Sequence, residues 1–178
     1  MLEVARPDFP VADRSTFADS ELTAAAKGLY VIRDFAPDQP PRLRDRPGLQ
    51  FHGQSLERFA PVEAAGINVK VIAAISEELF DRQSEAYRNS VLPPEARYDM
   101  MVVSTGTRRS WPIRDVGPLT DAYSLTSDWD NQWLTGGLEP DVIAEAHLDP
   151  ESIFVGIKRF AEARAERLDQ QQGYLAAL

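Results

Sequence analysis

Hydrophobic positions alternate between strand-like runs and helix-like spacings from about residue 24 onward. β-Branched and aromatic residues favour strands at 28–35, 49–54, 67–75 and 98–105. The last of these, "YDMMVVST", is apolar without a break from Met100 to Val103, which is typical of a strand buried on both faces. The pattern therefore predicts at least four strands of an α/β sheet.

Helical spacing of hydrophobic residues follows two of these strands. A short helix is expected within 55–66, where Pro61 would kink or shorten it. A longer helix is expected from Glu77 to about Leu92, ended by Pro93 and Pro94. The hydrophobic residues that share one face of this second helix are Leu79, Phe80, Ala86, Tyr87 and Val91.

Two closing helices are predicted after a long irregular stretch. The first runs from about Pro140 to His147. The second starts at the Asp149-Pro150 signal and continues through Leu168, with Arg and Glu on its exposed face. Its hydrophobic face carries Ile153, Ile157, Phe160 and Ala161.

This order of elements predicts a three-layer α/β/α sandwich on a mostly parallel sheet of about five strands. With 178 residues, 43% of them hydrophobic, the chain suits one globular domain. We expect residues 1–23 to form an N-terminal arm or linker, residues 24–172 to form the domain, and residues 173–178 to form a tail.

Composition narrows the function classes. A net charge of −9 repels nucleic acid and anionic lipid, and no cluster of Lys and Arg with interleaved aromatic residues offsets it locally. The nearest candidates, "PRLRDR" (41–46) and "TRRSW" (107–111), are short. The absence of cysteine excludes thiolate nucleophiles and cysteine metal sites. No stretch reaches the roughly 18 uncharged apolar residues of a membrane span. These features lead us to expect a cytoplasmic protein that binds neither nucleic acid nor membrane.

The junction between the third predicted strand and its helix, "INVKVIAAISEELF", lacks the glycine that usually lets such junctions hold phosphate. Ser76 can cap the helix, and Glu77 and Glu78 suit its positive end. Acids in that place repel a phosphate. The best strand-helix junction of the chain is thus built to exclude the usual ligand.

A candidate ligand or anion site lies at the carboxyl edge of the sheet. It would combine His52, Gln54, Ser104, Thr105 and Arg108, since "STGTRR" can form a backbone nest with charge beside it. A lone histidine is more often structural, however, and this segment can equally be an ordinary exposed turn.

Other chemistry-bearing residues favour structural interpretations. His147 ends a helix, where the helix dipole stabilises it. Trp129 and Trp133 in "SDWDNQW" could stack a sugar, but we prefer that they pin a loop onto the core. The chain has no HExxH, CxxC or GxSxG motif, so we assign no catalytic, cofactor-binding or metal-binding residue.

The segment "GINVKVIAAISEELFDRQSEAYRNSVLP" (66–93) carries a distinctive combination of residues. It fits a strand of the type G-x-x-V-x-V-V-S followed by F-D-x-Q and Y-x-x-x-V-L-P. The matching residues are Gly66, Val69, Val71, Ile72, Phe80, Asp81, Gln83, Tyr87, Val91, Leu92 and Pro93. In this respect the chain resembles the C-terminal domain of the transketolase and 2-oxo acid dehydrogenase group of thiamine-diphosphate enzymes. A looser resemblance covers residues 24–170.

The resemblance implies that thiamine diphosphate and magnesium belong to two other domains of the enzyme, whose motifs this chain lacks. In such enzymes the C-terminal domain is a smaller α/β layer that supports the dimer. "FHGQSLERF" and "VVSTGTRRSWP" depart from the usual family pattern, which implies a divergent branch.

Two hypotheses of different classes follow. In the first, the chain is the C-terminal domain or a split subunit of a transketolase-like transferase, inactive alone and assembled with the thiamine-binding domains as a homo- or hetero-oligomer. The interface would then include Trp111, Ile113, Tyr123 and Trp133, unless these residues simply cover the end of the sheet. In the second, the chain is a self-contained small-molecule-binding domain or enzyme that uses the carboxyl edge.

Overall fold

The computed structural model describes residues 23–35, 48–51, 60–107, 117–128 and 133–176. Five strands within these ranges form one sheet in the order β1-β3-β2-β4-β5. They are β1 (Leu29–Arg33), β2 (Gly48–Phe51), β3 (Lys70–Ala74), β4 (Met100–Ser104) and β5 (Leu125–Thr126). β1 pairs antiparallel with β3, and the other neighbouring pairs are parallel.

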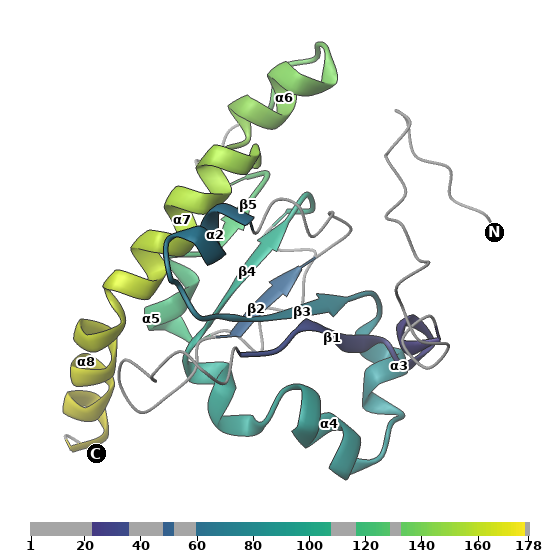
Figure 1. Cartoon of the computed structure of the whole chain (residues 1–178), viewed down its shortest axis with the longest axis vertical. Coiled ribbons are helices and arrows are strands. Elements are labelled where there is room, and N and C mark those ends of the chain that lie inside the picture. The colour runs from purple at the N-terminus through teal and green to yellow at the C-terminus, as the bar shows by residue number, and fades with distance from the viewer. Residues whose placement is uncertain (1–22, 36–47, 52–59, 108–116, 129–132, 177–178) are drawn as a thin grey trace.

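Helices lie on both sides of this sheet (Figure 1). The α-helices are α2 (Ala60–Ala64), α3 (Glu77–Asp81), α4 (Glu85–Val91), α5 (Pro118–Asp121), α6 (Glu139–Glu145), α7 (Pro150–Glu162) and α8 (Arg164–Ala176). Two short 3₁₀ helices, η1 (Ala24–Lys27) and η3 (Pro94–Tyr98), precede β1 and β4. The predicted α/β class is confirmed. No helix in the described part of the chain is long and apolar enough to cross a membrane.

Two hydrophobic clusters occupy the two faces of the sheet because successive strand residues point in opposite directions. Val71 of β3 packs in one cluster and its neighbour Ile72 in the other. The first cluster joins the sheet to α2 and α7, and the second joins it to α3 and α4. All five residues of β4 are buried, as the unbroken apolar run predicts.

The helix expected from Glu77 to Leu92 is instead two helices, because a second cap interrupts it. The Ser84 hydroxyl accepts the backbone N–H of Tyr87 at 3.3 Å and starts α4 anew. Phe80 and Val91 are buried as predicted, whereas Leu79 and Ala86 are exposed, so that part of the predicted hydrophobic face is wrong.

The last predicted helix is also divided. α7 ends at Glu162, and α8 continues to Ala176, beyond the expected domain boundary at residue 172. The expectation that its arginines face solvent is wrong for Arg164 and Arg167, which are 5% and 4% exposed. Both side chains contact the buried carboxylate of Asp99, which ties α8 to the segment that leads into β4.

Candidate functional site

The junction between β3 and α3 is closed by another segment of the chain. The Gly28 carbonyl accepts the backbone N–H groups of Ile75 and Ser76 at 2.8 and 3.2 Å. The Ser76 hydroxyl in turn accepts the N–H of Leu79 at 3.2 Å. Three backbone amides at this junction, those of Ile75, Ser76 and Leu79, are thus already engaged and cannot donate to a phosphate.

Gly28 fills this place because no other residue fits. Its φ is +90°, and an added Cβ would lie 2.2 Å from the Ser76 carbonyl oxygen and 2.5 Å from the Phe80 nitrogen. The β3–α3 junction has no glycine of its own. Gly28, in the turn before β1, instead lets the backbone there approach the backbone of the junction closely.

The two acidic residues at the same junction lie at the positive N-terminal end of α3. Glu77 and Glu78 lie in the first turn of α3, as expected. Hydrogen bonding to its own backbone amide, and then to the Ser76 hydroxyl at 2.8 Å, lowers the pKa of Glu78. The junction is accordingly anionic at neutral pH, which opposes a phosphate ligand.

The residues that carry the family resemblance hold these short helices on the sheet. The rings of Phe80 and Tyr87 meet edge-on with centroids 6.3 Å apart. The Tyr87 hydroxyl donates to the Leu29 carbonyl at 2.9 Å, and burial raises the pKa of that phenol. Gln83 donates its side-chain amide to the Leu79 carbonyl at 2.8 Å. The contacts of Phe80, Tyr87 and Gln83 in the structure therefore stabilise the fold.

The predicted carboxyl-edge site is described only in part. Ser104 is buried, and its hydroxyl accepts the Gly106 N–H at 3.0 Å, so the proposed nest loses that donor. Thr105 is exposed beside it. His52, Gln54 and Arg108 lie outside the described residues.

The predicted interface residues separate into two environments. Trp133 is 98% exposed, so the interpretation that it pins a loop onto the core is wrong. Tyr123 is half-buried against the first hydrophobic cluster, with its ring 5.9 Å from that of Phe160. Trp111, Ile113 and Trp129 lie outside the described residues.

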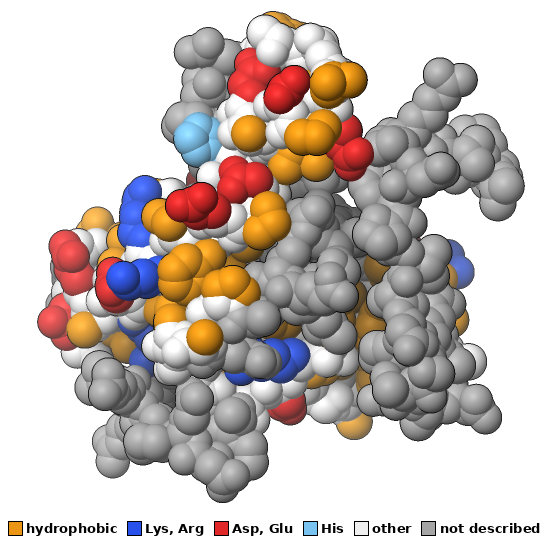
Figure 2. Space-filling view, turned by 45° about the horizontal axis from the view of Figure 1, so that its top comes forward, with side chains coloured by type: hydrophobic (Ala, Val, Ile, Leu, Met, Phe, Trp, Pro, Cys, Tyr) orange, Lys and Arg blue, Asp and Glu red, His pale blue; other side chains and the backbone are white. Residues whose placement is uncertain are grey.

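Further large hydrophobic side chains are exposed. Leu138, just before α6, is 74% exposed, and Ile75 and Leu79 at the β3–α3 junction are 48% and 37% exposed. Figure 2 shows hydrophobic and acidic side chains side by side on the end of the molecule that carries α6. The exposed hydrophobic side chains at this end of the molecule are a candidate interaction surface.

His147 directly follows Ala146, the C-cap residue of α6, so it lies at the helix end where the sequence places it. Its backbone is in the left-handed region, with φ of 55°. The His147 N–H donates to the Ala144 carbonyl and the Leu148 N–H to the Ile143 carbonyl, both at 3.0 Å. This is a Schellman motif, in which glycine is the usual residue at the left-handed position.

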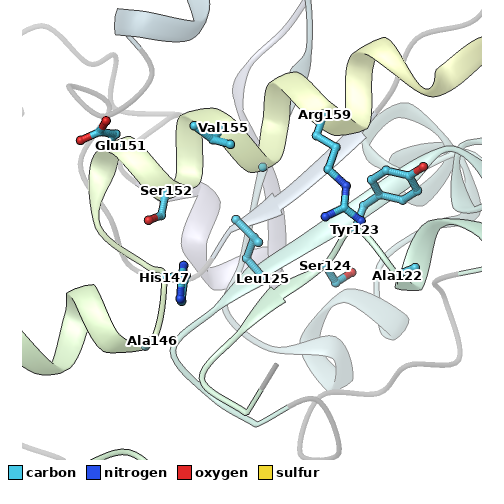
Figure 3. A pocket seen from close by; sticks show the side chains of 11 residues that line it. Ala122, Tyr123, Ser124, Leu125, Ala146, His147, Glu151, Ser152, Val155 and Arg159 are labelled. Atoms are coloured by element: carbon cyan, nitrogen blue, oxygen red, sulfur yellow. The ribbon is translucent and has the colours of Figure 1, made fainter. Parts of the chain in front are cut away.

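A pocket of about 430 Å³ opens between α7 and β5 (Figure 3). Its walls are mostly apolar, with Leu125 from β5 and Val155 and Gly156 from α7. His147 and the exposed Arg159 also line it. The Arg159 guanidinium lies over the Tyr123 ring, 5.0 Å from its centroid.

Sequence reasoning missed this pocket and the Asp99 cluster. The pocket brings together segments that are separate in sequence, and charged residues on a terminal helix are ordinarily exposed. A signal was present in the spacing of Arg164 and Arg167, which places both on one helical face. In the described part of the chain, no group of three His, Asp or Glu side chains is placed to hold a metal ion.

A family model, curated relatives and solved structures all relate this chain to transketolases. Residues 55–115 match the model of the transketolase-like C-terminal domain. A transketolase of Bacillus subtilis is 26% identical over 110 residues, covering 62% of this chain and 16% of that protein. Transketolase 2 of Aliivibrio fischeri is 34% identical over 100 residues, covering 52% of this chain and 15% of that protein.

Solved structures show the same fold. The transketolase from Leishmania mexicana superposes with a TM-score of 0.56 at 19% identity, over 79% of this chain and 19% of that one. The R525L mutant of the Pichia stipitis transketolase gives 0.52 at 21% identity, over 78% and 18%. This chain thus spans less than a fifth of the length of these relatives.

Proposed function

Because this chain carries a transketolase C-terminal-like domain, we propose that it is the C-terminal domain or a split subunit of a transketolase-like transferase. It supports assembly of the enzyme and has no cofactor site of its own. Its partners are the thiamine-binding domains of the same enzyme, in a homo- or hetero-oligomer. Thiamine diphosphate and magnesium belong to those domains.

The closed β3–α3 junction is the observation that carries this proposal. An α/β domain that bound a diphosphate at this junction would need free backbone amides and no adjacent acids. Here the Gly28 carbonyl engages the amides of Ile75 and Ser76, while Glu77 and Glu78 stand in the first helical turn. The residues present do not fit the diphosphate of the cofactor.

The exposed aromatic and aliphatic side chains support a role through surfaces. Trp133 and Leu138 are more exposed than such side chains usually are, and they lie close together in sequence before α6. Burial of a tryptophan at a partner surface contributes strongly to binding. Trp133 is therefore the residue that we place in the assembly interface.

Sedimentation velocity tests this role. We expect the purified chain to self-associate with concentration, or to co-sediment with co-expressed thiamine-binding domains, and to show no ketol transfer alone. Trp133→Ser should weaken association without lowering the melting temperature, because this side chain makes little contact within the chain.

Tyr174→Ser is the matched control, since Tyr174 is also exposed, at 64%, but lies on α8, away from α6 (Figure 1). It should leave association unchanged. A monomer at every concentration that also ignores the thiamine-binding domains would defeat the proposal.

A further inference from the structure

The pocket between α7 and β5 has the size and lining of a small-molecule site. Its volume of about 430 Å³ lies within the ~300–1,000 Å³ typical of ligand pockets. Residues from three separate segments form it: the α5–β5 connection, the end of α6, and α7. Apolar walls with a few polar groups are the usual composition of such sites.

Along α7, the residues that line the pocket change from acidic and polar, through apolar, to basic. Glu151 and Ser152 lie at the start of the helix, Val155 and Gly156 in the middle, and Arg159 at the other end. Arg159 lies eight positions after Glu151, which is about 12 Å along the helix axis. An anion held by Arg159 would therefore avoid the carboxylate of Glu151 while its apolar part contacts the middle of the wall.

The Arg159 guanidinium is available for such an anion. Within the described residues it stacks on Tyr123 and pairs with no carboxylate, unlike Arg164 and Arg167, which both contact Asp99. A guanidinium on an aromatic ring keeps its edge donors for a carboxylate, which it can bind with two parallel hydrogen bonds.

His147 gives a second reason to assign a ligand to this pocket. Its left-handed backbone would be less strained as glycine, which the Schellman motif favours. Figure 3 shows Leu125 between the His147 and Arg159 side chains. The imidazole thus lines the pocket at the opposite side of the apolar floor from the guanidinium.

We propose that this pocket binds a small organic carboxylate with an apolar body. The carboxylate lies on Arg159, the body lies over Leu125 against Val155, and His147 closes the far side. Trp133, the residue placed in the assembly interface, does not line this pocket, so either proposal can fail without the other.

Titration of the full chain with sodium benzoate, followed by ¹H–¹⁵N NMR, tests the site. We expect saturable shifts of the Leu125, Val155 and Gly156 amides. Benzyl alcohol, which lacks the carboxylate, should bind at least about tenfold more weakly, a ratio that one charge-assisted hydrogen bond accounts for. Acetate, which keeps the carboxylate but lacks the apolar body, should also bind at least about tenfold more weakly, because it buries no apolar ring. If acetate or inorganic phosphate bound as tightly as benzoate, the apolar body would contribute nothing to binding, and the proposal would be overturned.

Arg159→Gln should weaken benzoate at least about tenfold. Lys158→Gln removes the same charge one residue away on the exposed side of α7 and should leave affinity unchanged. His147→Gly should raise the melting temperature yet weaken benzoate, a combination that a purely structural histidine would not give. Absence of saturable shifts, or equal affinity in wild type and Arg159→Gln, would overturn the proposal.

Discussion

The β3–α3 junction and the pocket beside β5 differ in the groups that each leaves available. The junction has the topology at which α/β proteins hold anions, yet Gly28 engages its amides and Glu78 adds negative charge. The pocket lies at the edge strand, where topology predicts no site, but its Arg159 side chain pairs with no carboxylate among the described residues. Available donors, more than strand order, determine where a ligand can bind.

The largest effect is expected from Asp99→Ala, which removes the buried carboxylate that ties α8 to the segment before β4. The Asp99 carboxylate contacts the buried guanidinium groups of Arg164 and Arg167, at 2.8 Å from the latter. Removal of one partner from a buried ion pair costs about 3–5 kcal/mol. Chemical denaturation should show this loss, and a change below about 1 kcal/mol would mean that the cluster does not anchor α8.

Gly28→Ala tests the closed junction, with Gly66→Ala as its matched control. Both glycines have positive φ, but an added Cβ at Gly66 meets nothing within 4 Å, whereas at Gly28 it strikes backbone atoms. Gly66→Ala should cost about 1–2 kcal/mol from backbone strain alone. Gly28→Ala should cost clearly more, and equal losses would show that the contact between η1 and α3 can relax.

Asp149→Ala tests the start of the pocket-lining helix α7. The Asp149 carboxylate accepts the N–H groups of Glu151 and Ser152, both at 3.0 Å, so its loss should cost about 1 kcal/mol. Partial burial acts to raise the pKa of Asp149, but its hydrogen bonds to Ser152 and Glu151 outweigh this and lower it.

The lowered pKa fixes the direction of a pH effect. The carboxylate of Asp149 stabilises the fold fully above the ordinary Asp pKa of about 3.9, and this contribution is lost as pH falls through the lower pKa of the folded state. Wild type and Asp149→Ala should therefore converge in stability as the solution is acidified. A constant difference down to the lowest pH would contradict the assigned cap.

The smallest effect is expected from Lys158→Ala on the exposed side of α7. Its ammonium lies 3.8 Å from the Glu162 carboxylate, and both side chains are more than half exposed. Exposed pairs four residues apart contribute about 0.3–0.5 kcal/mol. A loss above about 1 kcal/mol would show that α7 depends on its outer face as well as on Ile153, Ile157 and Phe160.

Features that depend on local chemistry could be predicted from sequence. The buried run of β4, the acids after Ser76 and the Asp149-Pro150 helix start are set by residues next to one another. The cap at Ser84 was missed because hydrophobic spacing continues across it. The sequence also gives no sign that Gly28 reaches Ser76, since that contact forms only when β1 pairs with β3.

The site was less predictable than the fold for the same reason. Of the proposed carboxyl-edge residues, the structure describes Ser104 and Thr105, and the Ser104 hydroxyl is engaged by Gly106. Arg159 and His147 reach one pocket only because α7 packs on Leu125 of β5 and the turn after α6 lies beside them. Trp133 could be proposed as an interface residue because bulky aromatic residues outside the core pattern often serve in recognition.

Calorimetric titration of thiamine diphosphate with magnesium into the purified chain tests the central claim most directly. The closed, acidic junction predicts no saturable heat from this chain alone, because its amides at Ile75 and Ser76 are already bonded to Gly28. Magnesium-dependent binding with micromolar affinity would contradict the claim that this domain acts through assembly and leaves the cofactor to its partners.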